Sequence, residues 1–486
     1  MRKSFIIGRK REIALLKECN ITPKSEFVVV YGRRRVGKTF IVQECLSKNF
    51  VFHVTGIFDQ PREEQLKNFY RSMQKWFDAD ILSNCGVTRC PKDWMETFDM
   101  LERILKVVPK PRRGKKVVFL DEMPWMDTQR SGFISALEHF WNSYAAWTHD
   151  IILVVCGSAA SWIVDRIINN QGGLHNRLTR LIHLMPFTLS ETEQFLKGKG
   201  FVWNRYDVVQ CYMSMGGIPY YLANIPLDAG SFPRAIDQMF FSQDGIMRNE
   251  YAHLYKSLFK NSNIYEAIVE QLAKKKMGMT LRELSDSAKI MWGGHLSESL
   301  ENLERCGFIR KYNAYGNKKK GTIYQLTDLY TLFYLQFVNE NVSIDGTYWQ
   351  TMIDSPSRRA WAGYAFEIVC LTHIGQIRAA LGFASVSCSA SAWKTEPSEE
   401  QEGAQIDLVI DRRDQIINLC EMKFSTVKFV IDSKYEEELR NKMNAFRIVS
   451  KTNSALHLTM VTTYGVKKNS HSGIVAAQVV LDDLFA

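Results

Sequence analysis

Residues 27–48 constrain the fold of this chain more than any other segment. A short β-branched run is followed by a loop bounded by glycines and then by apolar residues at helical spacing. Gly32, Gly37, Lys38 and Thr39 match the pattern G-x-x-x-x-G-K-[ST] at every fixed position. Glycines let backbone N–H groups curl around phosphates at a helix N-terminus, whose dipole favours negative charge. The segment therefore predicts a strand, a loop and a helix that together bind a nucleotide.

The loop residues have separate predicted roles. We expect Lys38 to reach the β- and γ-phosphates of ATP, and the hydroxyl of Thr39 to ligate Mg²⁺. The other residues expected to contact the nucleotide belong to the loop and to the first turn of the helix: Gly32, Arg35, Val36, Gly37 and Phe40. A glycine turn that binds no ligand is the alternative interpretation of the same pattern.

ATP hydrolysis also requires an acidic strand end, which residues 117–122 supply. Four apolar residues precede Asp121 and Glu122, and ligands of open α/β sheets bind where the strands end. We assign Asp121 to Mg²⁺ and Glu122 to polarising the attacking water. A third apolar run ends shortly before Ser158, which is predicted either to sense the γ-phosphate or to cap the next helix.

The order of these motifs resembles that of the archaeal-type ATPases of the STAND class, which are relatives of the AAA+ ATPases. The resemblance covers roughly residues 1–260. Besides the loop and the acidic strand, it is carried by residues 8–12, 157–158, 184–187 and 216–219 and by Arg177 and Arg180.

The resemblance implies an α/β P-loop ATPase core over residues 1–195 and a helical lid over residues 196–260. It further implies that Arg177 or Arg180 stabilises charge in the transition state. From the sequence alone we expect these two arginines on one face of a helix, which equally suits a solvated surface.

Residues 261–340 predict a winged helix-turn-helix. Helical spacing over 264–272, a capping box at Thr280 and Glu283, and helical spacing over 295–306 are followed by two short strands. Three helices and a hairpin form a module whose third helix can enter the major groove of DNA.

Basic residues gather in the same module. The chain has 62 Lys and Arg against 52 Asp and Glu, a formal net charge of +10, and lysines form runs at 274–276 and 318–320. We expect these runs to contact DNA phosphates. The third helix carries Glu298, Glu301 and Glu304, which argue against a deep fit in the groove. Protein contact therefore stays an alternative to DNA contact.

Residues 345–486 contain a constellation of acidic residues. Glu367 lies in an apolar helical run, where an unpaired carboxylate is costly, so it needs a partner or a metal. Asp407 lies on one predicted strand, and Glu421 and Lys423 lie on the next. Because side chains alternate along a strand, Glu421 and Lys423 share a face that Asp407 can meet across the hairpin.

This pattern resembles the PD-(D/E)XK nuclease superfamily, whose restriction-endonuclease-like α/β domain is a familiar C-terminal partner of STAND-class ATPases. The resemblance implies that Asp407, Glu421 and Glu367 hold Mg²⁺ and that Lys423 orients or activates water. Ile406 stands where the pattern has proline. The fold also binds DNA without cutting it, so both activities stay open.

Composition indicates the compartment. Ten cysteines without a C-x-x-C pair, no apolar leader and no apolar run of membrane-spanning length predict a cytoplasmic protein without a membrane anchor. Taken together, the sequence predicts a Mg²⁺-dependent ATPase whose nucleotide state controls DNA binding and DNA cleavage. The alternative is an ATP-gated DNA- or protein-binding switch with an inactive nuclease-like domain. Homo-oligomerisation is left open.

Overall fold

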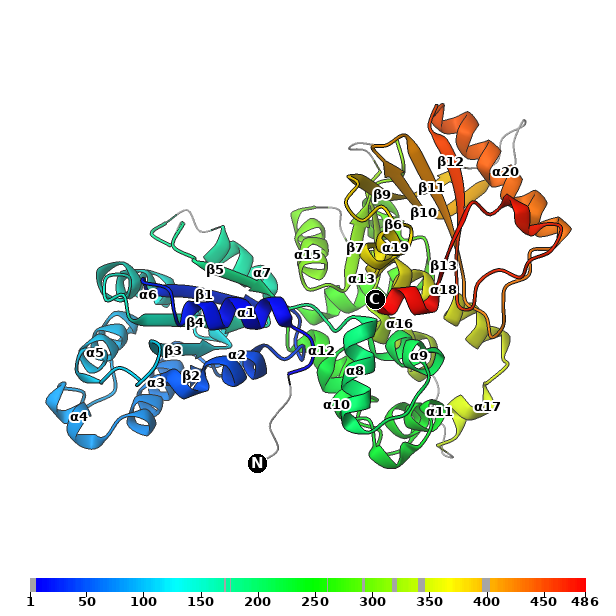
Figure 1. The fold of residues 1–486 in the computed structure, drawn as a ribbon. Helices are drawn as coiled ribbons and strands as arrows, with labels where there is room; N and C mark the ends of the chain where they lie inside the picture. Colours follow the sequence, from blue (N-terminus) through cyan, green and yellow to red (C-terminus); the bar gives the residue numbers. More distant parts are fainter. Residues whose placement is uncertain are drawn as a thin grey trace. The chain divides into compact units, whose positions relative to one another are not determined.

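The computed structural model describes residues 6–169, 172–174, 176–259, 261–290, 293–316, 321–339, 346–395 and 403–486. Its contacts divide the chain into two compact units. The first comprises residues 1–186 and 256–260, and the second comprises residues 187–255 and 261–486. Each unit contains a five-stranded sheet (Figure 1).

The sheet of the first unit is parallel throughout and has the strand order β2-β3-β4-β1-β5. Its strands are β1 Glu26–Tyr31, β2 Phe50–Thr55, β3 Lys116–Asp121, β4 Ile151–Gly157 and β5 Arg180–His183. Every residue of β3 and β4 is buried, as expected for parallel strands covered on both faces. The strand before the phosphate loop and the two further apolar strands lie where the sequence predicts them.

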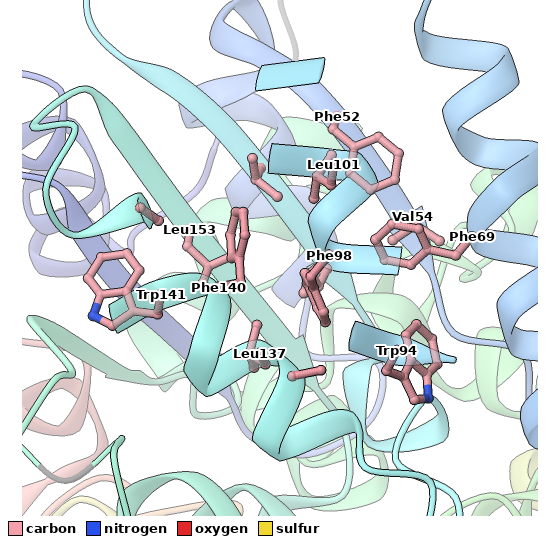
Figure 2. Close-up of a cluster of buried hydrophobic side chains, with 14 of the residues drawn as sticks. Phe52, Val54, Phe69, Trp94, Phe98, Leu101, Leu137, Phe140, Trp141 and Leu153 are labelled. Carbon is pink, nitrogen blue, oxygen red and sulfur yellow. The ribbon is translucent and has the colours of Figure 1, made fainter. Parts of the chain in front are cut away.

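Helices of the first unit pack aromatic side chains against one face of this sheet (Figure 2). Trp94 and Phe98 from α5 meet Phe69 from α3, which in turn meets Phe52 from β2. The centre of the Trp94 ring lies 4.8 Å from that of Phe133. Rings of this size supply much of the burial that stabilises a core. The helices are α1 Lys10–Cys19, α2 Lys38–Leu46, α3 Arg62–Trp76, α4 Ala79–Asn84, α5 Trp94–Val107, α6 Phe133–Phe140 and α7 Ala160–Ile163.

The region predicted as a lid is helical. Its helices are α8 Leu189–Lys199, α9 Arg205–Met215, α10 Pro219–Ala223, α11 Phe232–Ile236 and α12 Glu250–Lys256. Thr188 begins α8 with a capping box. Gly216 ends α9 in the left-handed conformation, and Pro219 begins α10.

The helices and the hairpin predicted for the middle of the chain are present. They are α13 Ser262–Lys274, α14 Leu281–Ala288 and α15 Gly294–Arg305, with an antiparallel sheet of β6 Met279–Thr280, β8 Ile323–Leu326 and β7 Ile309–Tyr312. The predicted capping box at Thr280 and Glu283 is confirmed. The lysine run 318–320 lies outside the described residues.

The second large sheet is mixed, with the order β13-β12-β11-β10-β9. Its antiparallel part contains the predicted hairpin of β10 and β11, and its other pairs are parallel. The elements are α16 Leu329–Phe333, α17 Tyr348–Thr351, α18 Pro356–Thr372, α19 Ile374–Ala380, β9 Cys388–Thr395, β10 Ala404–Arg412, β11 Ile416–Lys423, α20 Ser433–Ser450, β12 Ala455–Thr462 and β13 Ala477–Val480.

The middle hairpin is joined to this second sheet. Beyond β7, Ala314 forms a parallel bridge with Ala392 of β9, and the backbone N–H of Tyr315 donates to the Ala392 carbonyl at 3.0 Å. The Tyr315 ring lies 4.9 Å from the ring of Phe446 on α20. The two regions predicted as separate domains, 261–340 and 345–486, therefore lie in one compact unit.

Candidate functional site

The phosphate-binding loop connects β1 to α2 at the carboxyl edge of the first sheet. Gly32 and Gly37 have φ angles of 142° and 92°, which a residue with a side chain rarely adopts. A Cβ atom on Gly32 would also collide with the carbonyl oxygen of Leu184. Both glycines are therefore required by the backbone path.

The loop holds the ammonium group of Lys38 inside its curve. Lys38 is 5% exposed, and its Nζ donates to the carbonyl oxygens of Gly32 at 3.0 Å and Arg33 at 2.8 Å. This places a positive charge at the start of α2, where the N-terminal dipole also favours an anion. Val36 beside it is buried, whereas the predicted contact residue Phe40 is 45% exposed.

Thr39 and Asp121 meet, as their predicted roles require. The Thr39 hydroxyl donates to Oδ2 of Asp121 at 2.9 Å, although β4 lies between the strands that precede them. Burial and the neighbouring carboxylate of Glu122 raise the pKa of Asp121, and the hydrogen bond from Thr39 opposes that rise. A hydroxyl and a carboxylate in contact are oxygen donors of the kind that Mg²⁺ prefers.

Glu122 lies one residue beyond β3 in the left-handed conformation, with φ 44°. Its carboxylate accepts hydrogen bonds from the hydroxyl of Ser158 at 2.6 Å and from the backbone N–H of Ser158 at 3.2 Å. Ser158 does not cap the next helix, because the N-cap residue of α7 is Ala159. The alternative of a capping serine is therefore wrong, and Ser158 contacts the predicted catalytic carboxylate.

The predicted helix that carries two arginines is also wrong. Arg177 lies exposed in a turn, and Arg180 begins β5, which pairs with the edge of β1. Arg180 is opposite Val28 in that pairing, and its guanidinium contacts Glu18 at 3.1 Å. Its strand position lies four residues before Gly32 in register, about 13 Å along the strand. Arg180 therefore forms an ion pair with Glu18, at a strand position distant from the phosphate loop.

A second polar site lies in the second unit. A cleft of about 950 Å³ is lined by Glu367 from α18, Asp407 from β10, and Glu421 and Lys423 from β11. The antiparallel register pairs Leu408 with Cys420, which sets Asp407 next to Glu421 across the hairpin. The structure therefore brings together the four residues that the sequence singles out in this region.

Two carboxylates of this cleft, Glu367 and Glu421, have a raised pKa. Burial raises the pKa of Glu367 to about 8, and the charge of Asp407 adds to the rise, whereas Lys276 and Lys423 oppose it. Burial and Asp407 also raise the pKa of Glu421, which is 2% exposed. Buried carboxylates that repel one another gain from a bound cation.

Helix α20 supplies two further groups that the sequence did not point to. Nζ of Lys442 lies 3.1 Å and 3.2 Å from the two carboxylate oxygens of Glu421. The hydroxyl of Tyr435 donates to Oε2 of Glu421 at 3.3 Å. In the sequence, Lys442 looks like half of a surface pair with Glu438, four residues earlier on the helix. Only the packing of α20 against the sheet shows the contact with Glu421.

Among the described residues, no group of three or more His, Cys, Asp or Glu side chains is arranged as a metal site. The oxygen donors of Glu367, Asp407 and Glu421 suit a hard divalent cation. Their predicted role as its ligands stays a prediction.

Two of the lysines at 274–276 make contacts within the second unit. Nζ of Lys276 lies 5.5 Å from the centre of the Tyr364 ring on α18 and donates to the Ala360 carbonyl. Lys275 pairs with Glu283 at 2.5 Å.

On α15, Glu301 pairs with Arg305 and Glu304 pairs with Lys311 of β7. Two of the three glutamates that the sequence singles out on this helix are therefore paired with basic side chains of the same module.

The strand order, the glycine loop and the contact of Thr39 with Asp121 define the first unit as a P-loop nucleoside triphosphatase domain. Residues 6–225 match a family described as an ATPase domain predominantly from Archaea. This part of the chain is therefore similar to the ATPase domains of that family, a likeness that supports ATP binding and ATP hydrolysis.

Individual relatives are distant. An uncharacterised protein of Methanocaldococcus jannaschii is 23% identical over 341 residues, which cover 70% of each chain. A Walker-type ATPase of Pyrococcus abyssi has a TM-score of 0.49 at 18% identity, over 68% of this chain and 96% of its own. A STAND protein of Pyrococcus horikoshii has a TM-score of 0.31 at 16% identity, over 77% of this chain and 49% of its own.

Within the described residues, no helix has the length and apolar character to cross a bilayer.

Proposed function

We propose that this chain is a Mg²⁺-dependent ATPase whose nucleotide state controls DNA binding and cleavage of DNA at the C-terminal cleft. One observation carries the second half of the proposal. Glu367, Asp407, Glu421 and Lys423 come from three separate elements and line one cleft. A chance set of surface charges gives no reason for such convergence, whereas a site for phosphodiester chemistry requires it.

At the first site, Lys38 binds the β- and γ-phosphates, and Thr39 and Asp121 hold Mg²⁺. Glu122 orients a water and accepts its proton as the water oxygen bonds to the γ-phosphorus. The bond from the γ-phosphorus to the bridging oxygen breaks, which releases ADP and phosphate. Ser158 keeps the Glu122 carboxylate in place through its two hydrogen bonds.

At the second site, Asp407 and Glu421 hold the divalent cation and Glu367 completes its surroundings. Lys423 orients the water whose oxygen bonds to the scissile phosphorus, while one bond from phosphorus to a sugar oxygen breaks and that oxygen takes up the proton that the water loses. The products are a sugar hydroxyl and a terminal phosphate. When bound at either site, the cation neutralises phosphate charge and lowers the pKa of water.

DNA contact is assigned to the middle module, which we interpret as a winged helix-turn-helix. The run 274–276 begins at the last residue of α13 in this module, and the formal charge of the chain is +10. The glutamates of α15 favour contact with backbone phosphates through the rest of the module over deep insertion of this helix. Arg177 is exposed and is the remaining candidate for the arginine that stabilises γ-phosphate charge.

The test of the first site is ATP turnover by the wild type, Lys38→Ala and a matched Lys48→Ala variant. Lys48 follows α2 on the exposed surface. Turnover is expected to fall at least about a hundredfold in Lys38→Ala and to stay unchanged in Lys48→Ala. Equal rates in all three proteins would overturn the assignment.

The test of the second site incubates the protein with single-stranded, duplex and branched DNA and Mg²⁺ or Mn²⁺, with and without ATP. Glu421→Gln removes one ligand charge, and Glu437→Gln is the matched control, because Glu437 lines the same cleft from exposed positions on α20. We expect the wild type and Glu437→Gln to cleave DNA and Glu421→Gln not to. Undiminished cleavage by Glu421→Gln contradicts the nuclease centre.

A second candidate is an ATP-gated binding switch without cleavage. The bridge between Ala314 and Ala392 favours it, because it ties the middle hairpin to the second sheet as a scaffold would. This candidate predicts DNA binding that weakens with salt and changes with ATP, while the DNA stays intact with either metal.

A further inference from the structure

A positively charged side chain of the C-terminal cleft, that of Lys442, lies in contact with Glu421. Nζ of Lys442 lies 3.1 Å from Oε1 of Glu421, whereas Nζ of Lys423 lies 3.9 Å from Oε2. The Glu421 side chain is 3% exposed and that of Lys442 is 18% exposed. The shorter of these two ion pairs is therefore the one made by the lysine on α20 and not by the lysine of the strand motif.

A metal ion and Lys442 are alternative partners of one carboxylate. Glu421 accepts contacts from Lys442 on both oxygens and from Tyr435 on one of them. A divalent cation binds carboxylate oxygens at shorter distances than an ammonium group does, and it repels that group. Occupation of Glu421 by both at once is therefore unfavourable.

The helix offers Lys442 another acceptor. Nζ of Lys442 also lies 3.2 Å from Oε1 of Glu438, whose side chain is 54% exposed. Glu438 is four residues earlier on the same helix, so a change of side-chain rotamer moves Lys442 away from Glu421 and toward Glu438 without moving α20. The hydroxyl of Tyr435 still donates to Glu421 after this change. The ring centre of Tyr435 lies 5.1 Å from Nζ of Lys423.

We propose that Lys442 is an internal counter-cation that competes with the divalent cation for Glu421 and thereby sets the cation affinity of the cleft. This inference rests on the proposed role of Asp407 and Glu421 as cation ligands. Lys442 acts as a positioning residue, since it contacts a ligand of the cation and not the substrate.

The experiment measures Mn²⁺ binding to the full chain without nucleotide or DNA, by the loss of the free-ion electron paramagnetic resonance signal. The cleft's share of the binding is the part that Glu421→Gln removes. Lys442→Met is expected to bind Mn²⁺ at least about tenfold more tightly than the wild type. The matched control is Lys434→Met, because Lys434 is exposed, lies on the same helix and lines the same cleft. Its affinity is expected to equal that of the wild type.

A second variant predicts the opposite change and alters only an exposed residue. Glu438→Gln removes the negative charge of the alternative partner of Lys442, so Lys442 spends more time on Glu421 and Mn²⁺ binding weakens several-fold. Loss of binding in Glu421→Gln together with wild-type affinity in both Lys442→Met and Glu438→Gln overturns the competition but leaves the cation centre in place. Wild-type binding in Glu421→Gln overturns the cation centre itself.

Discussion

The carboxylate of Glu122 is held by both the hydroxyl and the backbone N–H of Ser158, at 2.6 Å and 3.2 Å. The two residues follow β3 and β4, which are neighbours in the sheet. Glu122 itself has a left-handed backbone, with φ 44°, that turns it away from the path of the strand. Strained backbone next to a reacting group is typical of functional sites, and here the second strand fixes where the carboxylate points.

Replacement of Ser158 tests this relationship. Ser158→Ala is expected to lower the ATP turnover number about tenfold to a hundredfold, since it removes one hydrogen bond to a charged group. Nucleotide affinity is expected to change little, because the loop and Lys38 are untouched. The control is Ser161→Ala on α7, whose hydroxyl has no hydrogen-bond partner among the described residues. Turnover in Ser158→Ala that equals or exceeds that of the wild type contradicts the positioning role.

The backbone path of the phosphate loop gives a second prediction. Gly32→Ala adds a Cβ that collides with the Leu184 carbonyl at a φ of 142°, so ATP affinity is expected to fall at least about tenfold and stability by about 1–3 kcal/mol. Gly200→Ala is the control, because Gly200 has a φ of 99° but nothing within 4 Å of the added atom. Titration with a fluorescent ATP analogue and thermal unfolding measure the two effects. Unchanged affinity in Gly32→Ala would refute the close approach.

The raised pKa of Glu367, about 8, predicts how stability depends on pH. Its carboxyl group is protonated in the folded protein at pH values where the unfolded chain is already ionised. Its contribution is therefore present below about pH 4.3 and is lost as pH rises toward 8, by up to about 1.4 kcal/mol per pH unit. Glu367→Gln removes this dependence, so its Tm is expected to exceed that of the wild type increasingly between pH 5 and pH 8 without divalent ions.

The control for this series is Glu437→Gln, an exposed residue of the same cleft. Its difference in Tm from the wild type is expected to stay constant over the same pH range. A constant difference for Glu367→Gln as well would show that the Glu367 carboxyl group titrates at its ordinary value. Added Mn²⁺ is expected to raise the Tm of the wild type more than that of Glu367→Gln, because a cation favours the ionised carboxylate.

Contact between the middle hairpin and the second sheet predicts shared stability. Tyr315→Ala removes the ring that packs on Phe446 and is expected to cost about 2 kcal/mol. Because Tyr315 belongs to the second unit, calorimetry is expected to show a lower Tm for the transition of that unit alone. The transition that added ATP shifts to higher temperature belongs to the first unit. If Tyr315→Ala lowers the Tm of that transition by the same amount, the two units do not unfold separately.

The sequence alone determined the local structure of the ATPase domain. The glycine loop, the apolar strands and the acidic strand end are short-range patterns, and each one specifies its own backbone and burial. Alternation along β10 and β11 likewise placed Asp407, Glu421 and Lys423 together, since a hairpin brings neighbouring segments into register. Glu367 was identified from the cost of its burial, which needs no knowledge of its partners.

Only the tertiary structure decided the contacts between distant segments. Arg180 was expected on a helix, but the free edge of β1 requires a paired strand, and residues 180–183 supply it. Ser158 reaches Glu122 because β3 and β4 are adjacent, and strand order is not written in any local pattern. Lys442 reaches Glu421 because α20 packs against the sheet. An exposed helical pair and a buried counter-charge look alike in sequence, since burial is a property of the assembled core.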